Sequence, residues 1–372
     1  MVDSYLKRIE ELERRCQDLE TIIETTNEHA DFIEAELEKR NELLRHIFGR
    51  YVTQEVVDEI LSAPDGQTLV GERRGITVLS SDLRGFTALS ERLPAEDIIR
   101  ILNCYFGIMS EVIAHWGGTI GGFLGDGIMV YFGAPIAMSD HARKALLCAQ
   151  AMQAAMSRVN HAMKERGYPD LEMGIGINTG EVVVGNIGSE QRAQYGAVGG
   201  PVNMAFRIES YSLGGDVLAS DATLRAAGPG VTILKSTTAF PKGSPGPITI
   251  HAIGGLAEAP GLAISHADTP LLDLKEPAPV TIWQVHGKDV APDPSAGLIV
   301  SLGKNAAVLR FVDATPLPSV LSNLRLELAG SGEAYAKVTS VENDQGRFVV
   351  RLTQHSPGVA RWLADVLNTG QQ

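Results

Sequence analysis

The first 47 residues carry apolar side chains in a strict alternation of three and four positions. The seam runs through Val2, Tyr5, Ile9, Leu12, Cys16, Leu19, Ile23, Thr26, Ala30, Ile33, Leu37, Arg40, Leu44 and Ile47. A heptad pattern of this length, with Glu, Lys and Arg filling much of the rest, predicts a coiled coil. A lone helix would leave so narrow a stripe wet, which favours a parallel homodimer formed through residues 1–47. A helix packed onto its own domain would need a broader apolar face.

The heptads break at Gly49, and residues 48–71 follow a different pattern. Thr53 can cap a short helix, and Pro64, Asp65 and Gly66 form a turn signal. We therefore expect a linker with a short transducing helix between the coiled coil and the next domain.

From residue 72 onward, strand patterns alternate with helix patterns. The segments are residues 76–79, 97–116, 119–132, 140–166, 171–184 and 200–211. Residues 119–132 read as a hairpin, and residues 171–184 read as a second hairpin that turns at Asn178, Thr179 and Gly180. The order strand, helix, strand, strand, helix, strand predicts an α+β domain with a ferredoxin-like core over residues 72–255.

The last third of the chain changes to short strands. Residues 256–273 read as a linker, and strand patterns follow at residues 297–300, 306–312, 324–328, 335–341 and 347–352. Their spacing predicts a small β-barrel over residues 274–372. A terminal helix at residues 357–367 carries Val359, Trp362, Leu363 and Val366 on one face, which should pack over the barrel.

Composition excludes some classes of protein. The chain of 372 residues is 44% hydrophobic and 21% charged, as expected for a folded soluble protein with two domains and an extended element. A net charge of −13 argues against binding to nucleic acid or anionic membranes. No apolar run approaches the roughly 20 residues of a membrane span, and the three cysteines show no metal-type spacing. We expect a cytoplasmic protein with reduced thiols.

Two aspartates stand at positions that present a side chain. Asp82 closes an apolar run and precedes the turn at Gly85, whereas Asp126 lies in the tight turn between two short apolar runs. Taken singly, each would be an ordinary turn or cap residue. Together, on neighbouring strands, they could hold Mg²⁺, which prefers oxygen ligands. The backbone N–H groups after Asp82 could bind phosphate, so the pattern indicates metal-assisted chemistry on a polyphosphate.

Four segments within residues 73–220 carry a family resemblance. They read VLSSDLRGFT, GGTIGGFLGDGIMVYFGAP, GIGINTGEVVVGNIGS and YGAVGGPVNMAFRIES. In order and spacing they resemble the class III nucleotidyl cyclases, the adenylate and guanylate cyclase family. The preceding FGRYVTQEVVDEIL resembles the segment that often joins a coiled coil to such domains. The resemblance implies a head-to-tail homodimer with active sites shared across the interface.

The resemblance also implies roles for individual residues. Asp82 and Asp126 would hold two Mg²⁺ or Mn²⁺ ions per active site, with the Leu83 carbonyl as a further ligand. One ion would lower the pKa of the ribose 3′-hydroxyl, and the other would neutralise the leaving pyrophosphate. Backbone amides at Gly85, Phe86 and Thr87 would bind phosphates.

The partner chain would complete the site through one helical face. There, Asn203 would orient the ribose, and Arg207, four residues later, would neutralise charge developing at the α-phosphate. Lys242 could reach the triphosphate, as a late-loop lysine does in the family, or it could be an ordinary turn lysine.

Two glycines depart from the adenylate cyclase pattern. Gly122 stands where a lysine is common, and Gly200 where an aspartate is common; those side chains read the purine edge. Guanylate cyclases carry a carboxylate at the first position and a small residue at the second, so this chain matches them at Gly200 alone. Neither glycine can reject a base through side-chain hydrogen bonds. We expect ATP as substrate, with GTP as the alternative and a catalytically degenerate nucleotide-binding scaffold as a third hypothesis.

The C-terminal strands resemble a PilZ-type barrel, a family that binds cyclic di-GMP through paired arginines. No arginine occurs between Arg225 and Arg310, and the expected binding loop is reduced to Ser301, Leu302 and Gly303. No other residue type in that stretch can replace the bidentate hydrogen bonds that arginine makes to phosphate or guanine. We therefore expect a regulatory or docking domain, with a possible protein partner, that does not bind this nucleotide.

Overall fold

The computed structural model describes residues 2–48, 71–189, 192–240, 246–264, 270–286, 289–313 and 315–369. The chain divides into two compact units, residues 1–69 and 70–372. Within its described residues the first unit is one helix, α1 (Val2–Phe48), which ends where the heptads were predicted to break. Its seam side chains Leu19, Ile23, Ile33 and Leu37 are exposed in the single chain. The expected transducing helix, in residues 49–70, lies outside the described residues.

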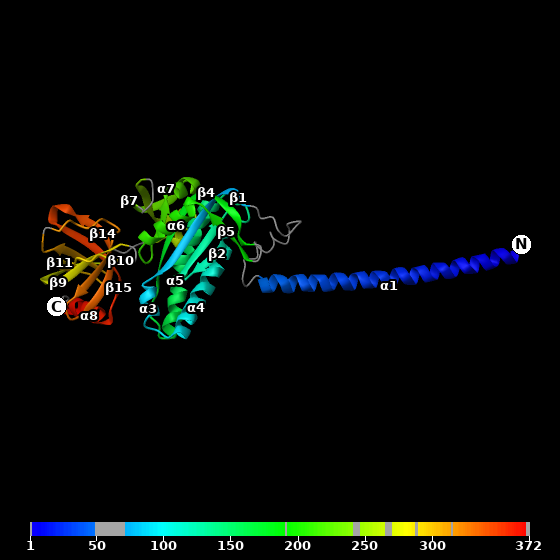
Figure 1. The fold of residues 1–372 in the computed structure, drawn as a ribbon, viewed down its shortest axis with the longest axis horizontal. Helices are drawn as coiled ribbons and strands as arrows, with labels where there is room; N and C mark the ends of the chain where they lie inside the picture. Colours follow the sequence, from blue (N-terminus) through cyan, green and yellow to red (C-terminus); the bar gives the residue numbers. More distant parts are fainter. Residues whose placement is uncertain are drawn as a thin grey trace. The chain divides into compact units, whose positions relative to one another are not determined.

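The second unit begins with an α+β domain built on one mixed sheet (Figure 1). Its strands follow the order β2-β3-β1-β4-β6-β8-β7, with β5 paired to β4. The strands are β1 (Glu72–Arg84), β2 (Thr119–Leu124), β3 (Gly127–Phe132), β4 (Glu172–Ser189), β5 (Arg192–Val198), β6 (Val217–Ser220), β7 (Val231–Ala239) and β8 (Ile248–Leu256). The helices are α3 (Phe86–Ser90), α4 (Ala95–His115), α5 (His141–Glu165), α6 (Gly200–Tyr211) and α7 (Asp221–Ala227). The ferredoxin-like core predicted from the sequence is confirmed as β1-α4-β2-β3-α5-β4.

The alternation of side chains along β1 separates two apolar clusters. Leu79 packs with α4 and α5 in the main core, whereas Ile76 and Val78 pack with Val202 and Ala205 of α6. Strand geometry explains this, because successive side chains point to opposite faces of a sheet. Residue 82 therefore lies at the end of a strand whose two faces are both anchored.

Helix α4 is long and apolar enough to cross a membrane, by length and composition alone. Its face formed by Ile101, Tyr105, Met109 and Ile113 is buried in the main core. Packing against the sheet and α5 therefore accounts for its apolar character.

The predicted hairpin at Asn178, Thr179 and Gly180 is wrong. All three residues lie inside β4, a continuous strand of 18 residues. The whole of β1, from Glu72 to Arg84, pairs with this region, so the backbone of the apparent turn has ladder partners throughout. The Thr179 hydroxyl bonds to that of Thr77 at 2.7 Å, and Asn178 donates its side-chain N–H to the Pro201 carbonyl at 2.9 Å. Tertiary pairing overrides the local turn propensity.

The C-terminal strands form the predicted barrel. Six strands run in the order β9-β11-β12-β15-β14-β13 and close through pairing of β9 with β13, while β10 extends β9. They are β9 (Leu272–His286), β10 (Asp289–Val290), β11 (Ser295–Leu302), β12 (Ala306–Phe311), β13 (Asn323–Leu328), β14 (Gly332–Glu342) and β15 (Arg347–His355). Helix α8 (Pro357–Thr369) buries Val359 and Leu363 in the barrel core, as predicted. Ahead of β9, a short 3₁₀ helix at Pro260–Leu262 lies in the expected linker.

Candidate active site

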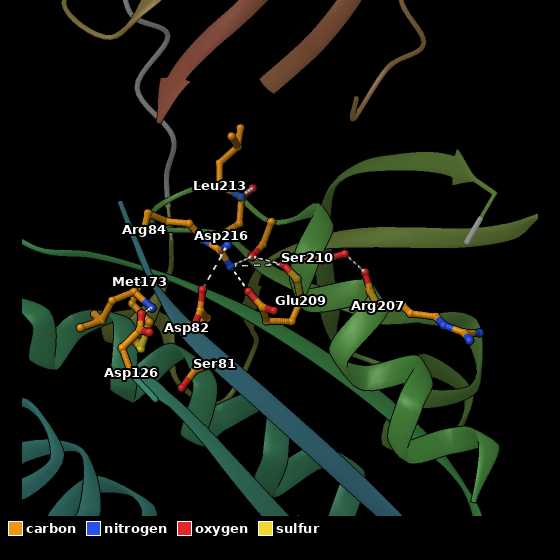
Figure 2. A network of polar contacts seen from close by, with 12 residues as sticks. Ser81, Asp82, Arg84, Asp126, Met173, Arg207, Glu209, Ser210, Leu213 and Asp216 are labelled. Carbon is orange, nitrogen blue, oxygen red and sulfur yellow. Dashed lines mark hydrogen bonds and ion pairs between the residues drawn. The ribbon is translucent and has the colours of Figure 1, made fainter. Parts of the chain in front are cut away.

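The two predicted metal-binding aspartates lie close together, Asp82 on β1 and Asp126 in the turn between β2 and β3. Antiparallel pairing sets Ser81 of β1 opposite Ile128 of β3, which brings Asp82 beside the β2–β3 turn that contains Asp126. The backbone N–H of Leu83 donates to Asp126 Oδ2 at 3.2 Å. Figure 2 shows both carboxylates on the same side of the strand, within one polar network.

Glycine makes this close approach possible. A Cβ at Gly127 would lie 2.9 Å from the Ser81 carbonyl oxygen and 3.6 Å from Asp82 Oδ1. Any larger residue would therefore push the turn away from β1. Gly125, with φ of +67°, supplies the left-handed conformation that the other side of the turn requires.

Burial disfavours the ionised form of both carboxylates. Burial raises the pKa of Asp126 to about 6, and the charge of Asp82 adds to this increase. Burial also raises the pKa of Asp82, which the Arg84 guanidinium partly opposes. Two half-buried carboxylates at one place are a favourable site for a divalent cation. Within the described residues, no further His, Cys, Asp or Glu joins them in a group of three that could hold a metal ion.

The predicted phosphate-binding turn follows directly. Gly85 adopts φ of +71° and precedes α3, Phe86 is buried, and Thr87 is exposed. The left-handed glycine lets the chain leave β1 and start a helix within one residue. The amides at residues 85–87 therefore follow Leu83, whose own N–H donates to Asp126, by two to four residues.

Asn203 and Arg207 lie on α6, away from the carboxylate pair. Buried Val202, Ala205 and Ile208 anchor the helix, which leaves Asn203 exposed and Arg207 partly exposed. Figure 2 shows the Arg207 guanidinium pointing away from Asp82 and Asp126. A single chain therefore brings the two metal-ligand candidates together but does not bring them together with Arg207.

Comparison with known proteins agrees with this geometry. Residues 70–253 match the family described as adenylate and guanylate cyclase catalytic domain. The crystal structure of the guanylyl cyclase Cya2 is 51% identical, covering 52% of this chain and 99% of that chain, with a TM-score of 0.51. This chain belongs to the class III adenylate and guanylate cyclase family.

Other cyclases match over the same region. Adenylate cyclase 1 of Rhizobium meliloti is 33% identical over 214 residues, which are 57% of this chain and 32% of that protein. The adenylyl cyclase CyaB of P. aeruginosa is 36% identical, covering 50% of this chain and 96% of that structure, with a TM-score of 0.48. The matched region is about a third of the length of the curated relatives. These relatives match about half of this chain. The matched family domain ends at residue 253, so the barrel lies outside it.

The positions expected to read the base are open in this cyclase. No heavy atom lies within 4 Å of a Cβ placed on Gly200, at the start of α6. At Gly122 the nearest atom to such a Cβ is Nε2 of Gln194, at 3.7 Å. Gln194, on β5, donates that N–H to the Gly121 carbonyl at 3.1 Å. Lys242 lies outside the described residues.

A polar network that was not predicted from the sequence joins the end of β1 to the end of α6. Arg84 Nη2–H donates to Glu209 Oε1 and to Ser212 Oγ, the latter at 3.0 Å, while Arg84 Nη1 lies 3.6 Å from Asp82 Oδ2. Arg84 and Glu209 are 14% and 11% exposed in their side chains. Each stands two residues after an expected site residue, Asp82 or Arg207, inside a quoted motif. Two opposite charges at matching places in two motifs were the signal from which this ion pair could have been predicted.

Proposed function

We propose that this chain is a nucleotidyl cyclase that converts ATP to 3′,5′-cyclic AMP and pyrophosphate, at a site completed by a second copy of the chain. The single observation that carries the proposal is the Asp82–Asp126 pair. Two half-buried carboxylates, one at the end of β1 and one in the β2–β3 turn, stand beside the turn at Gly85 that precedes α3. Membership of the cyclase family gives that pair a nucleoside triphosphate to act on.

The residues present fit a pair of divalent cations. Asp82, Asp126 and the Leu83 carbonyl offer the hard oxygen donors that Mg²⁺ and Mn²⁺ prefer. When bound, the ions would supply acidification of the ribose 3′-hydroxyl and neutralisation of charge on the triphosphate. The raised pKa of Asp126 fits this role, because a cation would offset both the burial and the repulsion from Asp82 that raise it.

The chain's own groups would position the substrate and stabilise charge. The 3′-oxygen attacks the α-phosphorus, its proton leaves to solvent, and the bond from the α-phosphorus to the pyrophosphate oxygen breaks. Amides of Gly85, Phe86 and Thr87 would hold the phosphates of the leaving group. Asn203 would orient the ribose, and the Arg207 guanidinium would neutralise charge that develops at the α-phosphate.

A second copy is required because one chain separates these groups. Arg207 points away from its own Asp82 and Asp126. A head-to-tail homodimer would set α6 of one chain against the carboxylate pair of the other. The exposed seam of α1, which includes Leu19, Ile23 and Leu37, supports a coiled coil that would hold the two copies together.

GTP cyclisation is the second candidate. The crystal structure that is 51% identical to this chain is that of a guanylyl cyclase. Gly122 and Gly200 offer no side chain that could favour either purine, and Gln194 is the polar side chain beside Gly122. The geometry therefore supports the cyclisation reaction but does not favour ATP over GTP.

Incubation of the full chain with equal ATP and GTP and with Mn²⁺ tests both candidates in one vessel. We expect cyclic AMP and an equal amount of pyrophosphate from the wild type, and neither product from Asp82→Ala. Predominant cyclic GMP would establish the second candidate. Nucleotide binding that survives Asp82→Ala, without turnover of either nucleotide by the wild type, would instead establish a non-catalytic scaffold.

We also propose a regulatory or docking role for the C-terminal barrel. Its PilZ-like pattern lacks the arginine pair, and Ser301 Oγ–H, in the reduced loop, donates to Asp273 Oδ1 at 2.6 Å. Isothermal titration with cyclic di-GMP is expected to give no heat of binding. Micromolar binding would overturn this part of the proposal.

A further inference from the structure

A lysine of the barrel is buried against the catalytic half of the chain. Lys337, on β14, is 3% exposed. Its Nζ–H groups donate to the carbonyl of Ser210 at 2.6 Å and to that of Ser212 at 3.1 Å. These carbonyls belong to the last turn and the C-cap of α6, the helix that carries Asn203 and Arg207.

The position of this ammonium group follows from the chemistry of a helix end. The last carbonyls of a helix have no intrahelical donors and carry partial negative charge, so a cation there is stabilised. An ammonium removed from water needs such partners, because its desolvation is costly. Glu209 and Asp216 also attract Lys337, whereas Arg84 repels it. The cyclase domain thus provides the acceptors that hold the Lys337 side chain in place.

Ser210 links the Lys337 contact to the backbone of Arg207. Ser210, whose carbonyl accepts from Lys337, donates its own hydroxyl to the Arg207 carbonyl at 2.7 Å. Arg84 holds the same turn from the other side, through Ser212 Oγ and Glu209. Two side chains, Arg84 from β1 and Lys337 from the barrel, therefore hold the end of α6.

The barrel also reaches the phosphate-binding turn. The Thr353 carbonyl oxygen lies 3.4 Å, and the Gln354 side chain 3.7 Å, from the place of a Cβ on Gly85. The barrel thus contacts both segments that the proposed reaction uses, the turn after Asp82 and the end of α6.

We propose that Lys337 is a positioning residue for catalysis, through which the barrel fixes α6 and so the orientation of Arg207. The proposal rests on the cyclase function proposed above. Arg207 stabilises charge in the transition state more than it binds the ground-state nucleotide. Loosening its helix should therefore lower kcat with little effect on KM.

The test uses the full chain with Lys337→Met and a matched control, Lys235→Met. Lys235, on β7, also donates across to the barrel, to the Thr339 carbonyl at 2.9 Å, and among the described residues it makes no hydrogen bond to α6. We expect Lys337→Met to lower kcat about tenfold, with KM within about twofold. Lys235→Met should leave both near the wild-type values. In an Arg207→Ala background, Lys337→Met should have little further effect, because residues that act through one group are not additive.

Hydrogen exchange of the unliganded proteins gives a measurement that does not depend on turnover. Lys337→Met should speed exchange in the last turn of α6, residues 208–212, and Lys235→Met should not. Unchanged exchange in that turn would overturn the proposal even if the wild type made no cyclic nucleotide. An equal loss of kcat in the wild-type and Arg207→Ala backgrounds would overturn it as well, since it would indicate a general loss of folded protein. Failure of the wild type to turn over any nucleotide would count against the proposed function alone.

Discussion

Arg84 and Glu209 form a buried ion pair that joins β1, the strand of Asp82, to α6, the helix of Arg207. Burial raises the pKa of Glu209, and the Arg84 charge opposes that increase. Each ion therefore depends on the other, because neither has enough contact with water to be solvated alone. The pair therefore fixes the position of α6 relative to the end of β1 that carries Asp82, within each chain.

Replacing Glu209 by Gln should strongly destabilise the cyclase domain. The change removes the hydrogen-bonded counter-charge of the partly buried Arg84 guanidinium and leaves only Asp82 Oδ2, 3.6 Å from Nη1. Breaking a buried pair typically costs about 3–5 kcal/mol, and the remaining carboxylate should place the cost at the lower end. Glu181→Gln is the matched control, since its pair with Arg73 is 66% and 77% exposed and should contribute less than about 1 kcal/mol. Urea unfolding followed by circular dichroism measures both. Similar midpoints for the two variants would show that the buried pair has no special role.

Replacing Asp126 by Asn should abolish turnover and at the same time stabilise the metal-free protein. Burial, and then the charge of Asp82, raise the pKa of Asp126, so replacing its carboxylate by a neutral amide relieves the folded state. We expect a loss of activity of about 100-fold or more and a higher thermal midpoint in EDTA. Asp344→Asn, at an exposed turn residue, should change neither quantity. A lower midpoint for Asp126→Asn in EDTA would contradict the electrostatic argument.

Lys337 should make stability rise with pH on the alkaline side. Burial, with repulsion from Arg84, lowers its pKa to about 7 from the usual 10.5. Between these values the unfolded chain binds more protons than the folded chain, so the free energy of unfolding increases as pH rises from 7 towards 10. Below pH 7 both states are protonated, and this contribution to the pH slope vanishes. Unfolding curves for wild type and Lys337→Met at pH 6, 8 and 9.5 isolate it as a difference. Parallel pH profiles would show that Lys337 does not titrate in this range.

Gln194 should influence the choice of base. Its carboxamide is the nearest polar group to the open position at Gly122, held there by a hydrogen bond to Gly121. Replacement by Ala removes the hydrogen-bonding group, so the ratio of kcat/KM for ATP and GTP should move about tenfold towards one. Gln345→Ala, in an exposed turn of the barrel, serves as control. A ratio unchanged by Gln194→Ala would assign base selection to other groups.

Local pattern was sufficient for the elements whose partners are close in sequence. The hairpin around Asp126, α6 from Gly200 to Tyr211 and the strands of the barrel were predicted because periodicity and turn residues fix them locally. The turn at residues 178–180 was wrongly predicted because its conformation is set by β1, about 100 residues earlier. The candidate site likewise contains residues that local pattern predicted and residues that it did not. Asp82 and Asp126 were found by their place in strand and turn, whereas Gln194, Glu209 and Lys337 act through neighbours distant in sequence.

The α1 seam should control the assembly of active sites. Ile23 and Ile33 are exposed on the isolated helix at 59% and 45%, and both are core positions of the predicted heptads. Replacing both by Asp would bury charges in the coiled coil, so we expect dissociation to monomers at micromolar concentration by sedimentation velocity. Specific activity should then rise with protein concentration, because each site needs groups from two chains. Glu24→Gln with Glu34→Gln, off the seam, should leave a dimer whose specific activity is constant. A double-Asp variant that sediments as the wild type would place the dimer contact outside α1.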